Sequence, residues 1–334
     1  MNCILGIDGG GSKTICIMMD DEGKILGRGE AGASNYQSIG IEAAKKQIEF
    51  AIYQARITAL NSKNNINIIA ICLGLAGVSR PEDIEVIKWI VNELQNIQNI
   101  PAITWTLKPS DIVICHDALI ALMGGVGDAV GIVVAAGTGS IIFGRNHEGT
   151  TKRVGGWGYI LGDEGGGYKI AVAGMQAALK AYDGRGEKTI LLENFQRHLQ
   201  TENIEKLIEI IYRKGWGVKE IAALAPVVDQ SASEGDNIAN RIIDEAVREL
   251  VIATATVIDN IFDCQQVVEV VTTGSIWLGK CGLRERFINS LIHKYPLVNV
   301  IYPRYEPAYG AGLLALKALG LGDNYSTLRN NEVH

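Results

Sequence analysis

Two glycine-rich turns, each between two strand-like runs, are the first features of the sequence that could do chemistry. In the first, Asp8 ends an apolar run, and the turn that follows leads into a second run at residues 15–19. Glycines let backbone N–H groups turn towards an anion. Residues 137–140 repeat this pattern between the runs 131–136 and 141–145. The two turns predict a pair of phosphate-binding hairpins in a duplicated fold, with one nucleotide between the halves.

Neither turn has the spacing of the commonest nucleotide-binding motifs. The first turn lacks Gly-x4-Gly-Lys-Ser/Thr, and β-branched residues follow it where a helix would be needed. These features exclude a P-loop and a dinucleotide-binding turn. An ordinary tight turn would explain either segment alone, but the repetition at matching strand positions favours phosphate binding.

A second chemical candidate follows the strand-like run 112–115. His116 and Asp117 stand at its carboxyl end, before a helix-like run at 118–123. In open α/β sheets, ligands bind at the carboxyl ends of strands. Asp117 could be the N-cap of the helix or a carboxylate directed at the space between the two hairpins, and both can hold at once. We expect His116 to be structural, because neighbouring strand positions point to opposite faces.

A third candidate is the segment 155–167, in which seven of thirteen residues are glycine. This composition is unfavourable in helices and strands, and it costs entropy unless the backbone approaches something closely. Trp157 supplies a flat apolar face, and Asp163 and Glu164 supply hydrogen-bond acceptors. The segment therefore favours a binding loop for a polyhydroxylated ligand over a surface linker.

The surrounding pattern predicts the elements that position these residues. Asn35 lies on a small-residue loop after the third strand, where a turn former and a ligand contact are both open interpretations. Ser79 and Glu82 have capping-box spacing before a helix that reaches about residue 97. The other predicted elements are a helix at 41–60, strands at 66–75, 267–273 and 298–301, a glycine turn at 274–277, helices at 281–294 and 307–319, and a helical stretch at 168–262 with breaks near 183–186, 215–217 and 234–236.

Composition limits the class of protein. The 334 residues are 47% hydrophobic and 20% charged, with 39 glycines and 7 prolines, which indicates about two compact α/β domains. The net charge of −6 argues against a nucleic-acid partner. Without a basic leader or a long apolar run, we expect a cytoplasmic protein with no membrane partner. The six cysteines have no Cys-x2-Cys spacing, so neither disulfides nor a zinc site is expected.

With these motifs, the chain resembles the N-acetylglucosamine kinase branch of the sugar kinase, Hsp70 and actin superfamily, which also contains BadF-type ATPases and bacterial glucosamine kinases. The resemblance spans nearly the whole chain. It is carried by residues 8–12, 34–35, 116–118, 137–140, 156–158, 162–165 and 273–275. It implies an α/β fold of two duplicated actin-like (ribonuclease H-like) domains with a nucleotide cleft between them. The expected domains are 1–117 plus 308–334, and 118–307 with a helical insertion.

The resemblance also implies roles for individual residues. Asp117 would be the catalytic base and contact the sugar, and Asp8 would orient Mg²⁺ through water. The terminal phosphates of ATP would be held by Gly10, Gly11, Ser12, Lys13, Thr138 and Gly139. The amino sugar would be contacted by Asn35, Ser140, Gly156, Trp157, Gly158 and Asp163. The adenosine would be bordered by Ala222, Gly274 and Ser275.

The implied reaction transfers the γ-phosphoryl group of Mg-ATP to the 6-hydroxyl of N-acetylglucosamine, in a homodimeric enzyme. Glucosamine is the alternative substrate, because Val154 stands where kinases of known N-acetylglucosamine specificity can carry cysteine. An alternative of another class is an ATPase activator of 2-hydroxyacyl-CoA dehydratases, which binds an iron–sulfur cluster through exposed cysteines. Cys264 and Cys281 are the candidates for that role. An ATP-dependent switch without a substrate would leave Trp157 and Asp163 unexplained.

Overall fold

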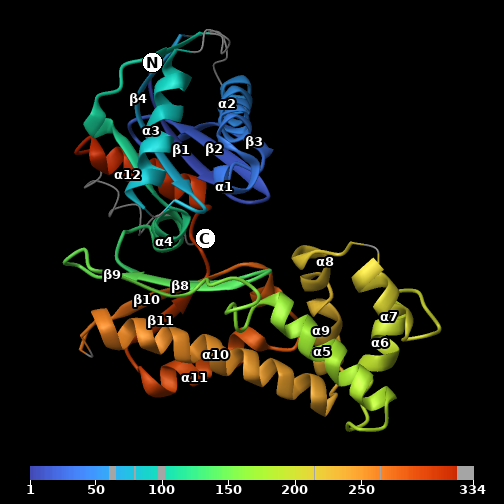
Figure 1. Ribbon diagram of the computed structural model, residues 1–334. Coiled ribbons are helices and arrows are strands. Elements are labelled where there is room, and N and C mark those ends of the chain that lie inside the picture. The colour runs from blue at the N-terminus through green and yellow to red at the C-terminus, as the bar shows by residue number, and fades with distance from the viewer. Residues whose placement is uncertain (60–64, 79, 97–101, 214, 264, 322–334) are drawn as a thin grey trace. The chain divides into compact units, whose positions relative to one another are not determined.

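The computed structural model describes residues 1–59, 65–78, 80–96, 102–213, 215–263 and 265–321 (Figure 1). The chain forms two compact units. Unit 1 comprises Met1–Ala129 with Pro303–His334, and unit 2 comprises Val130–Tyr302. The expected boundaries at 117/118 and 307/308 placed helix α4 (Asp117–Val126) in the second unit. The structure places α4 in unit 1, because it packs on α12 (Pro307–Ala318) so closely that a Cβ on Gly310 would overlap the Ile120 carbonyl oxygen.

The first sheet carries the hairpin of Asp8. Its strand order is β3-β2-β1-β4-β5, and β6 also pairs with β4. Strands β1, β2 and β3 are antiparallel, whereas β4 runs parallel to β1, β5 and β6. The bounds are β1 Asn2–Gly9, β2 Lys13–Met19, β3 Ile25–Gly32, β4 Ile66–Leu75, β5 Ile103–Trp105 and β6 Ile112–His116.

Helices cover both faces of this sheet (Figure 1). Helices α2 (Ile41–Thr58) and α3 (Pro81–Gln95) pack on one face, and α4 and α12 pack on the other. Strand β1 accordingly buries side chains on both faces, with Leu5 in one core and Ile4 in the other. This explains the continuous apolar run before Asp8, which is typical of a central strand with both faces covered.

The second sheet repeats the first. Its order is β11-β10-β7-β8-β9, so β7, β8 and β9 form an antiparallel meander while β10 and β11 run parallel to β7. The strands are β7 Gly131–Ala136, β8 Ser140–Arg145, β9 Thr151–Gly155, β10 Val268–Thr273 and β11 Val298–Ile301. The predicted duplication is confirmed, since β7 to β11 reproduce the order and directions of β1 to β5.

The second unit also carries the predicted helical stretch. It contains α5 Gly167–Tyr182, α6 Leu191–His198, α7 Lys206–Ile208, a π-helical segment Glu209–Arg213, α8 Val218–Ala222, α9 Ala225–Ser233, α10 Asn237–Ile261, a 3₁₀ turn Ser275–Leu278 and α11 Leu283–Lys294. The predicted breaks fall between helices, as after Tyr182 and before Val218 and Asn237. Helix α10 packs along β7, β8 and β9, while α8 and α9 both pack on α5.

Local capping differs from one expectation. The predicted partner Ser79 lies outside the described residues, and α3 is capped by Asp83, whose Oδ2 accepts from the Arg80 backbone N–H at 2.8 Å. Tyr36 begins a short helix, α1 (Tyr36–Ile39), that the sequence pattern did not reveal.

Among the helices within the described ranges, none combines the length and apolar character that crossing a membrane would need.

Candidate active site

The first hairpin turn, residues 10–12, is held in place by its neighbours. The Gly10 N–H donates to the Lys13 carbonyl at 2.9 Å, which closes the turn. The Ser34 and Asn35 N–H groups donate to the Gly10 carbonyl at 3.0 and 3.3 Å. Ser12 and Lys13 remain exposed. These hydrogen bonds hold the turn in one conformation while its outer side stays accessible, as a phosphate-binding hairpin requires.

The glycines of this turn serve different purposes. A Cβ on Gly9 would overlap the Leu75 side chain and the Ser34 hydroxyl, so Gly9 is required by packing. Gly11 meets nothing within 4 Å, and neither Gly10 nor Gly11 has a positive φ. Their missing side chains leave the backbone accessible, which fits close approach of a ligand.

Two carboxylates lie at the carboxyl edge of the first sheet. Asp8 pairs with Gly74 across the β1–β4 ladder, and the pairing of β4 with β6 ends at His116, so Asp8 and Asp117 flank the end of β4. A Cβ on Gly74 would overlap the Ile120 side chain. Gly74 thus lets α4 lie directly on β4, and this close packing brings the Asp117 carboxylate near Asp8.

The structure corrects the interpretation of Asp117 as a helix cap. The N-cap of α4 is His116, whose Nδ1 accepts from the Ala118 N–H at 3.1 Å. Asp117 is the first helical residue, and its Oδ1 lies 2.7 Å from His116 Nδ1. The expectation that His116 is structural is confirmed. Asp117 is therefore released from capping and keeps a carboxylate with a side chain 37% exposed.

The charge of Asp8 is poorly compensated by the protein. Burial raises the pKa of Asp8 to about 7, and the negative charges of Asp117 and Glu306 act in the same direction, against a smaller lowering by Lys13. A carboxylate with this environment fits Mg²⁺, which binds through one or two carboxylates together with water and substrate phosphates. The described residues contain no group of three or more His, Cys, Asp or Glu side chains suited to a metal. Asp8 therefore suits a Mg²⁺ ion that a substrate phosphate also coordinates.

Asn35 follows β3 on the loop that supports the first turn. Its Oδ1 accepts from the Gln37 N–H at 3.1 Å and caps α1. Gln37 in turn donates to the Gly77 carbonyl at 2.8 Å, which joins this loop to the end of β4. The capping uses the side-chain oxygen of Asn35, so its amide nitrogen is the group left for a ligand.

The second hairpin turn, residues 137–139, is packed against the glycine-rich segment 155–167, called the glycine loop below. The Gly137 N–H donates to the Gly139 carbonyl at 2.9 Å, and the Gly167 and Tyr168 N–H groups donate to the carbonyls of Gly137 and Thr138. A Cβ on Gly139 would overlap the Asp163 carboxylate. The turn, the loop and the start of α5 therefore form one close-packed cluster in unit 2.

Asp163 organises the loop through its backbone and its side chain. Its φ is 62°, a left-handed conformation that aspartate tolerates better than most residues. Its Oδ1 accepts from the Gly158 N–H at 3.2 Å. Burial raises its pKa, and the negative charge of Glu164 adds to the effect. Its Oδ2 lies beside Gly139, and hydrogen bonds from the Gly158 and Ser140 backbones lower the pKa against these effects.

Trp157 and Ser140 lie on the same loop cluster in different environments. The Trp157 side chain is 66% exposed, and the Arg153 guanidinium stacks on its ring at 4.7 Å from the centroid. Ser140 is buried, and its hydroxyl donates to the Glu164 carbonyl at 2.6 Å. The Ser140 side chain therefore stabilises the loop, while the Trp157 ring is presented to solvent between the left-handed residues Gly156 and Gly158.

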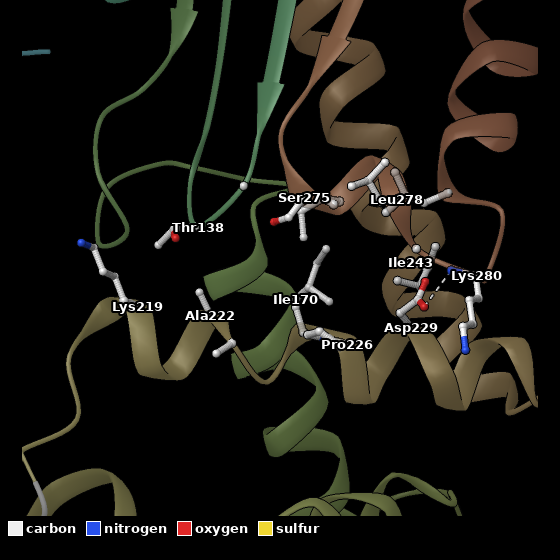
Figure 2. A pocket seen from close by; sticks show the side chains of 16 residues that line it. Thr138, Ile170, Lys219, Ala222, Pro226, Asp229, Ile243, Ser275, Leu278 and Lys280 are labelled. Carbon is white, nitrogen blue, oxygen red and sulfur yellow. Dashed lines mark hydrogen bonds between the residues drawn. The ribbon is translucent and has the colours of Figure 1, made fainter. Parts of the chain in front are cut away.

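A pocket of about 440 Å³ in unit 2 brings together residues expected to border a nucleotide (Figure 2). Thr138 comes from the second turn, Ala222 from the end of α8 and Ser275 from the 3₁₀ turn after β10. Figure 2 shows Thr138 and Lys219 at one end and Asp229 and Lys280 at the other. Aliphatic side chains, including Ile170, Pro226, Ile243 and Leu278, line the space between them. This is the composition of a slot for a flat, partly apolar group with a polar end.

Gly274 supports this pocket from behind. Its φ is 108°, and a Cβ there would overlap the Ala136 carbonyl oxygen. The backbone at the end of β10 therefore requires glycine at this position, and Gly274 does not itself line the pocket. Ser275, immediately after it, does line the pocket.

Sequence reasoning did not identify the far wall of the pocket. Both carboxylate oxygens of Asp229 accept backbone N–H groups, from Lys280 at 2.8 Å and from Cys281 at 3.1 Å. These bonds join α9 to the segment before α11. Because Asp229 and Lys280 lie far apart in the sequence and belong to no motif, no local signal could have identified them.

The cysteines give no support to an iron–sulfur site. Cys281 is buried, and burial raises the pKa of its thiol to about 12. A cluster ligand must be an accessible thiolate. The other candidate, Cys264, lies outside the described residues.

The chain is similar to known proteins over most of its length. The model of the BadF/BadG/BcrA/BcrD ATPase family matches residues 5–315. The N-acetylmuramic acid/N-acetylglucosamine kinase of Clostridium acetobutylicum is 37% identical over 315 residues, which cover 94% of this chain and 98% of that protein. The N-acetyl-D-glucosamine kinase of Dictyostelium discoideum is 33% identical over 324 residues, with the same coverage.

A solved structure shows the same fold. The protein of Chromobacterium violaceum, provisionally named N-acetylglucosamine kinase, superposes with a TM-score of 0.70 at 24% identity, covering 94% of this chain and 98% of that one. At this level of identity, the structural likeness supports the two-sheet α/β architecture only. On the family model and the two relatives, the chain belongs to the BadF/BadG/BcrA/BcrD ATPase family.

Proposed function

We propose that the protein is an ATP-dependent sugar kinase that phosphorylates the 6-hydroxyl of N-acetylglucosamine. The observation that carries the proposal is the near-complete similarity to two relatives that are both named for this amino sugar. The second hairpin, the glycine loop and the exposed Trp157 are consistent with it. Glucosamine is the alternative acceptor.

Asp117 is the proposed general base. It lies at the carboxyl edge of the first sheet, it is partly exposed, and His116 relieves it of capping α4. Phosphoryl transfer has a largely dissociative transition state, so the enzyme gains most by positioning the reactants and stabilising spread charge. Asp117 orients the sugar hydroxyl and accepts its proton, while the two turns donate backbone N–H groups to the phosphates.

Asp8 is the proposed magnesium-binding residue, acting through water. When bound, the ion would neutralise charge on the β- and γ-phosphates. The Asp8 carboxylate, whose pKa of about 7 reflects burial and the charge of Asp117, gains most from a neighbouring cation. The exposed Lys13 adds a positive charge beside it.

The sugar and the adenosine are assigned to separate residues. Asn35, Trp157 and Asp163 would bind the sugar, with the backbone of residues 156–158 in close approach. The pocket of Thr138, Ala222 and Ser275 would take the nucleoside, with Thr138 directed at the phosphates. Trp157 supplies a flat apolar surface and Asp163 a carboxylate, and both suit a pyranose with several hydroxyl groups.

The test is an ADP-release assay with Mg-ATP and equal concentrations of glucose, mannose, glucosamine and N-acetylglucosamine. We expect the highest kcat/KM for N-acetylglucosamine, and its 6-phosphate as product by NMR. Asp117→Asn serves as the catalytic control. If no sugar raised ADP release above the rate with ATP alone, the kinase proposal would fail. Fastest turnover of glucosamine would instead select the free amine as the acceptor class.

A further inference from the structure

A single carboxylate lines the pocket of unit 2 at the end opposite Thr138. It belongs to Asp229, a half-buried residue of α9 and the only acidic one among the described residues that line the pocket. Figure 2 shows Asp229 beyond the aliphatic side chains that separate it from Thr138 and Lys219. A nucleotide whose phosphates lie at Thr138 therefore extends its base towards Asp229.

The neighbouring backbone fixes the position of this carboxylate. Its Oδ2 accepts from the Lys280 N–H at 2.8 Å, and its Oδ1 accepts from the Cys281 N–H at 3.1 Å. The Lys280 side chain runs away from Asp229 (Figure 2). A Cβ on Gly279 would lie 2.3 Å from Oδ1, so glycine there lets the chain pass directly over the carboxylate. Asp229 is thus held in place before a ligand arrives, which lowers the cost of recognition.

Asp229 has little acceptor capacity left. A carboxylate has about four lone-pair sites and accepts hydrogen bonds only. The two backbone N–H groups use two of these sites. Burial raises the pKa of the Cys281 thiol to about 12, and a hydrogen bond to Asp229 adds to that effect, so the thiol uses a third site. Within the described residues, Asp229 therefore retains room for about one further donor.

The edges of the purine bases differ in how they meet such a group. Adenine carries a 6-amino group, which donates, whereas hypoxanthine and guanine carry an oxygen at the same position, which accepts. A carboxylate repels that oxygen. Guanine could meet a carboxylate through its N1 and 2-amino groups together, but two donors need two vacant acceptor sites. One remaining site beside an otherwise apolar slot fits the single amino group of adenine.

We propose that Asp229 determines the base of the phosphoryl donor by accepting a hydrogen bond from the 6-amino group of adenine. The inference rests on the proposed function, in which this pocket holds the nucleoside of ATP. The aliphatic side chains of the slot bind any flat base by contact area, and they do not distinguish one purine from another. The preference for adenine then depends on Asp229.

The test compares three donors that differ only at position 6 of the purine. They are ATP, purine riboside triphosphate, which lacks the amino group, and inosine triphosphate, which carries an oxygen there. For each, kcat/KM is measured with N-acetylglucosamine by NMR of the phosphorylated sugar. A hydrogen bond to a charged group contributes enough to predict about a tenfold preference of wild type for ATP over purine riboside triphosphate, through KM.

The variants are Asp229→Asn, Asp229→Ser and the matched control Asp244→Asn. Asp244 lies on α10 next to the pocket-lining Ile243, but it does not line the pocket itself, and it pairs with Arg286 at 2.7 Å. Its replacement therefore removes the same charge close to the pocket and leaves the base edge unchanged. Asp229→Ser removes the carboxylate with a smaller side chain, in case the amide of Asp229→Asn disturbs the backbone N–H groups.

We expect both Asp229 variants to lose most of the preference for ATP over purine riboside triphosphate, and Asp244→Asn to keep it. Asp229→Asn should also use inosine triphosphate better relative to ATP, because an amide N–H donates to the 6-oxygen. Melting temperatures show whether each variant is folded, and comparing donors on one variant cancels any general loss of activity. Equal use of ATP and purine riboside triphosphate by wild type, or an unchanged ratio in the Asp229 variants, would overturn the inference. Failure of wild type to phosphorylate the sugar with any of the three donors would instead overturn the proposed function.

Discussion

Replacing Asp8 with asparagine should stabilise the metal-free protein at neutral pH. The pKa of Asp8 is about 7 in the folded protein, against an ordinary value of 3.8. Below pH 3.8 both the folded and the unfolded chain hold the proton, so Asp8 costs nothing. As the pH rises towards 7, the unfolded chain releases the proton while the folded protein retains it, and stability is lost.

The size of the effect follows from the two pKa values. A difference of this size corresponds to about 4 kcal/mol above pH 7, and to about 2 kcal/mol near pH 5.5. Asparagine keeps the shape of the side chain and removes the charge. The free energy of unfolding of Asp8→Asn should therefore exceed that of wild type by an amount that grows from about pH 4 to about pH 7 and is then constant.

The assay is urea unfolding of both proteins over this pH range with a metal chelator present. Glu22→Gln is the control, because it removes one exposed carboxylate from the hairpin after β2 in the same unit. We expect that control to follow wild type at every pH. Stability curves of Asp8→Asn and wild type that ran parallel would refute the assignment of a raised pKa. Added Mg²⁺ should stabilise wild type more than Asp8→Asn if Asp8 holds the ion.

Three further predictions test the site and the fold. Asp117→Asn should lower kcat by a factor of about 10² to 10⁴ without changing the melting temperature, whereas His116→Ala should lose about 1 kcal/mol of stability with the α4 cap; near-normal kcat in Asp117→Asn would contradict the general base. Asp163→Ala and Asp163→Gly should both raise the sugar KM about tenfold and leave the KM for ATP unchanged. The glycine variant controls for backbone strain, because glycine tolerates the φ of 62°. An equal rise of the KM for ATP would indicate collapse of the loop. Gly6→Ala should destabilise by about 3 kcal/mol or more, because its Cβ would overlap the Ala308 carbonyl oxygen; a wild-type melting temperature would contradict this packing.

The sequence by itself determined the duplication, the candidate loops and most of the strands, although it did not reveal the short strand β5 (Ile103–Trp105). Apolar runs such as that of β4, Ile66–Leu75, identify buried parallel strands because both faces must be covered. Glycine turns between such runs at residues 9–12 and 137–140 repeat in the same order, and the second sheet repeats the first for this reason. These are local signals, and each arises from steric and burial requirements within a few residues.

Tertiary structure decided which residues share a site and which of two neighbours performs a role. Both His116 and Asp117 could cap α4 from their position in the sequence, and the structure shows that His116 Nδ1 accepts the Ala118 N–H while α4 packs directly on Gly74 of β4. Asp229 reaches the segment before α11 only because α9 packs beside it. Such contacts join residues far apart in the chain, where spacing and composition carry no signal, so only the folded structure identifies them.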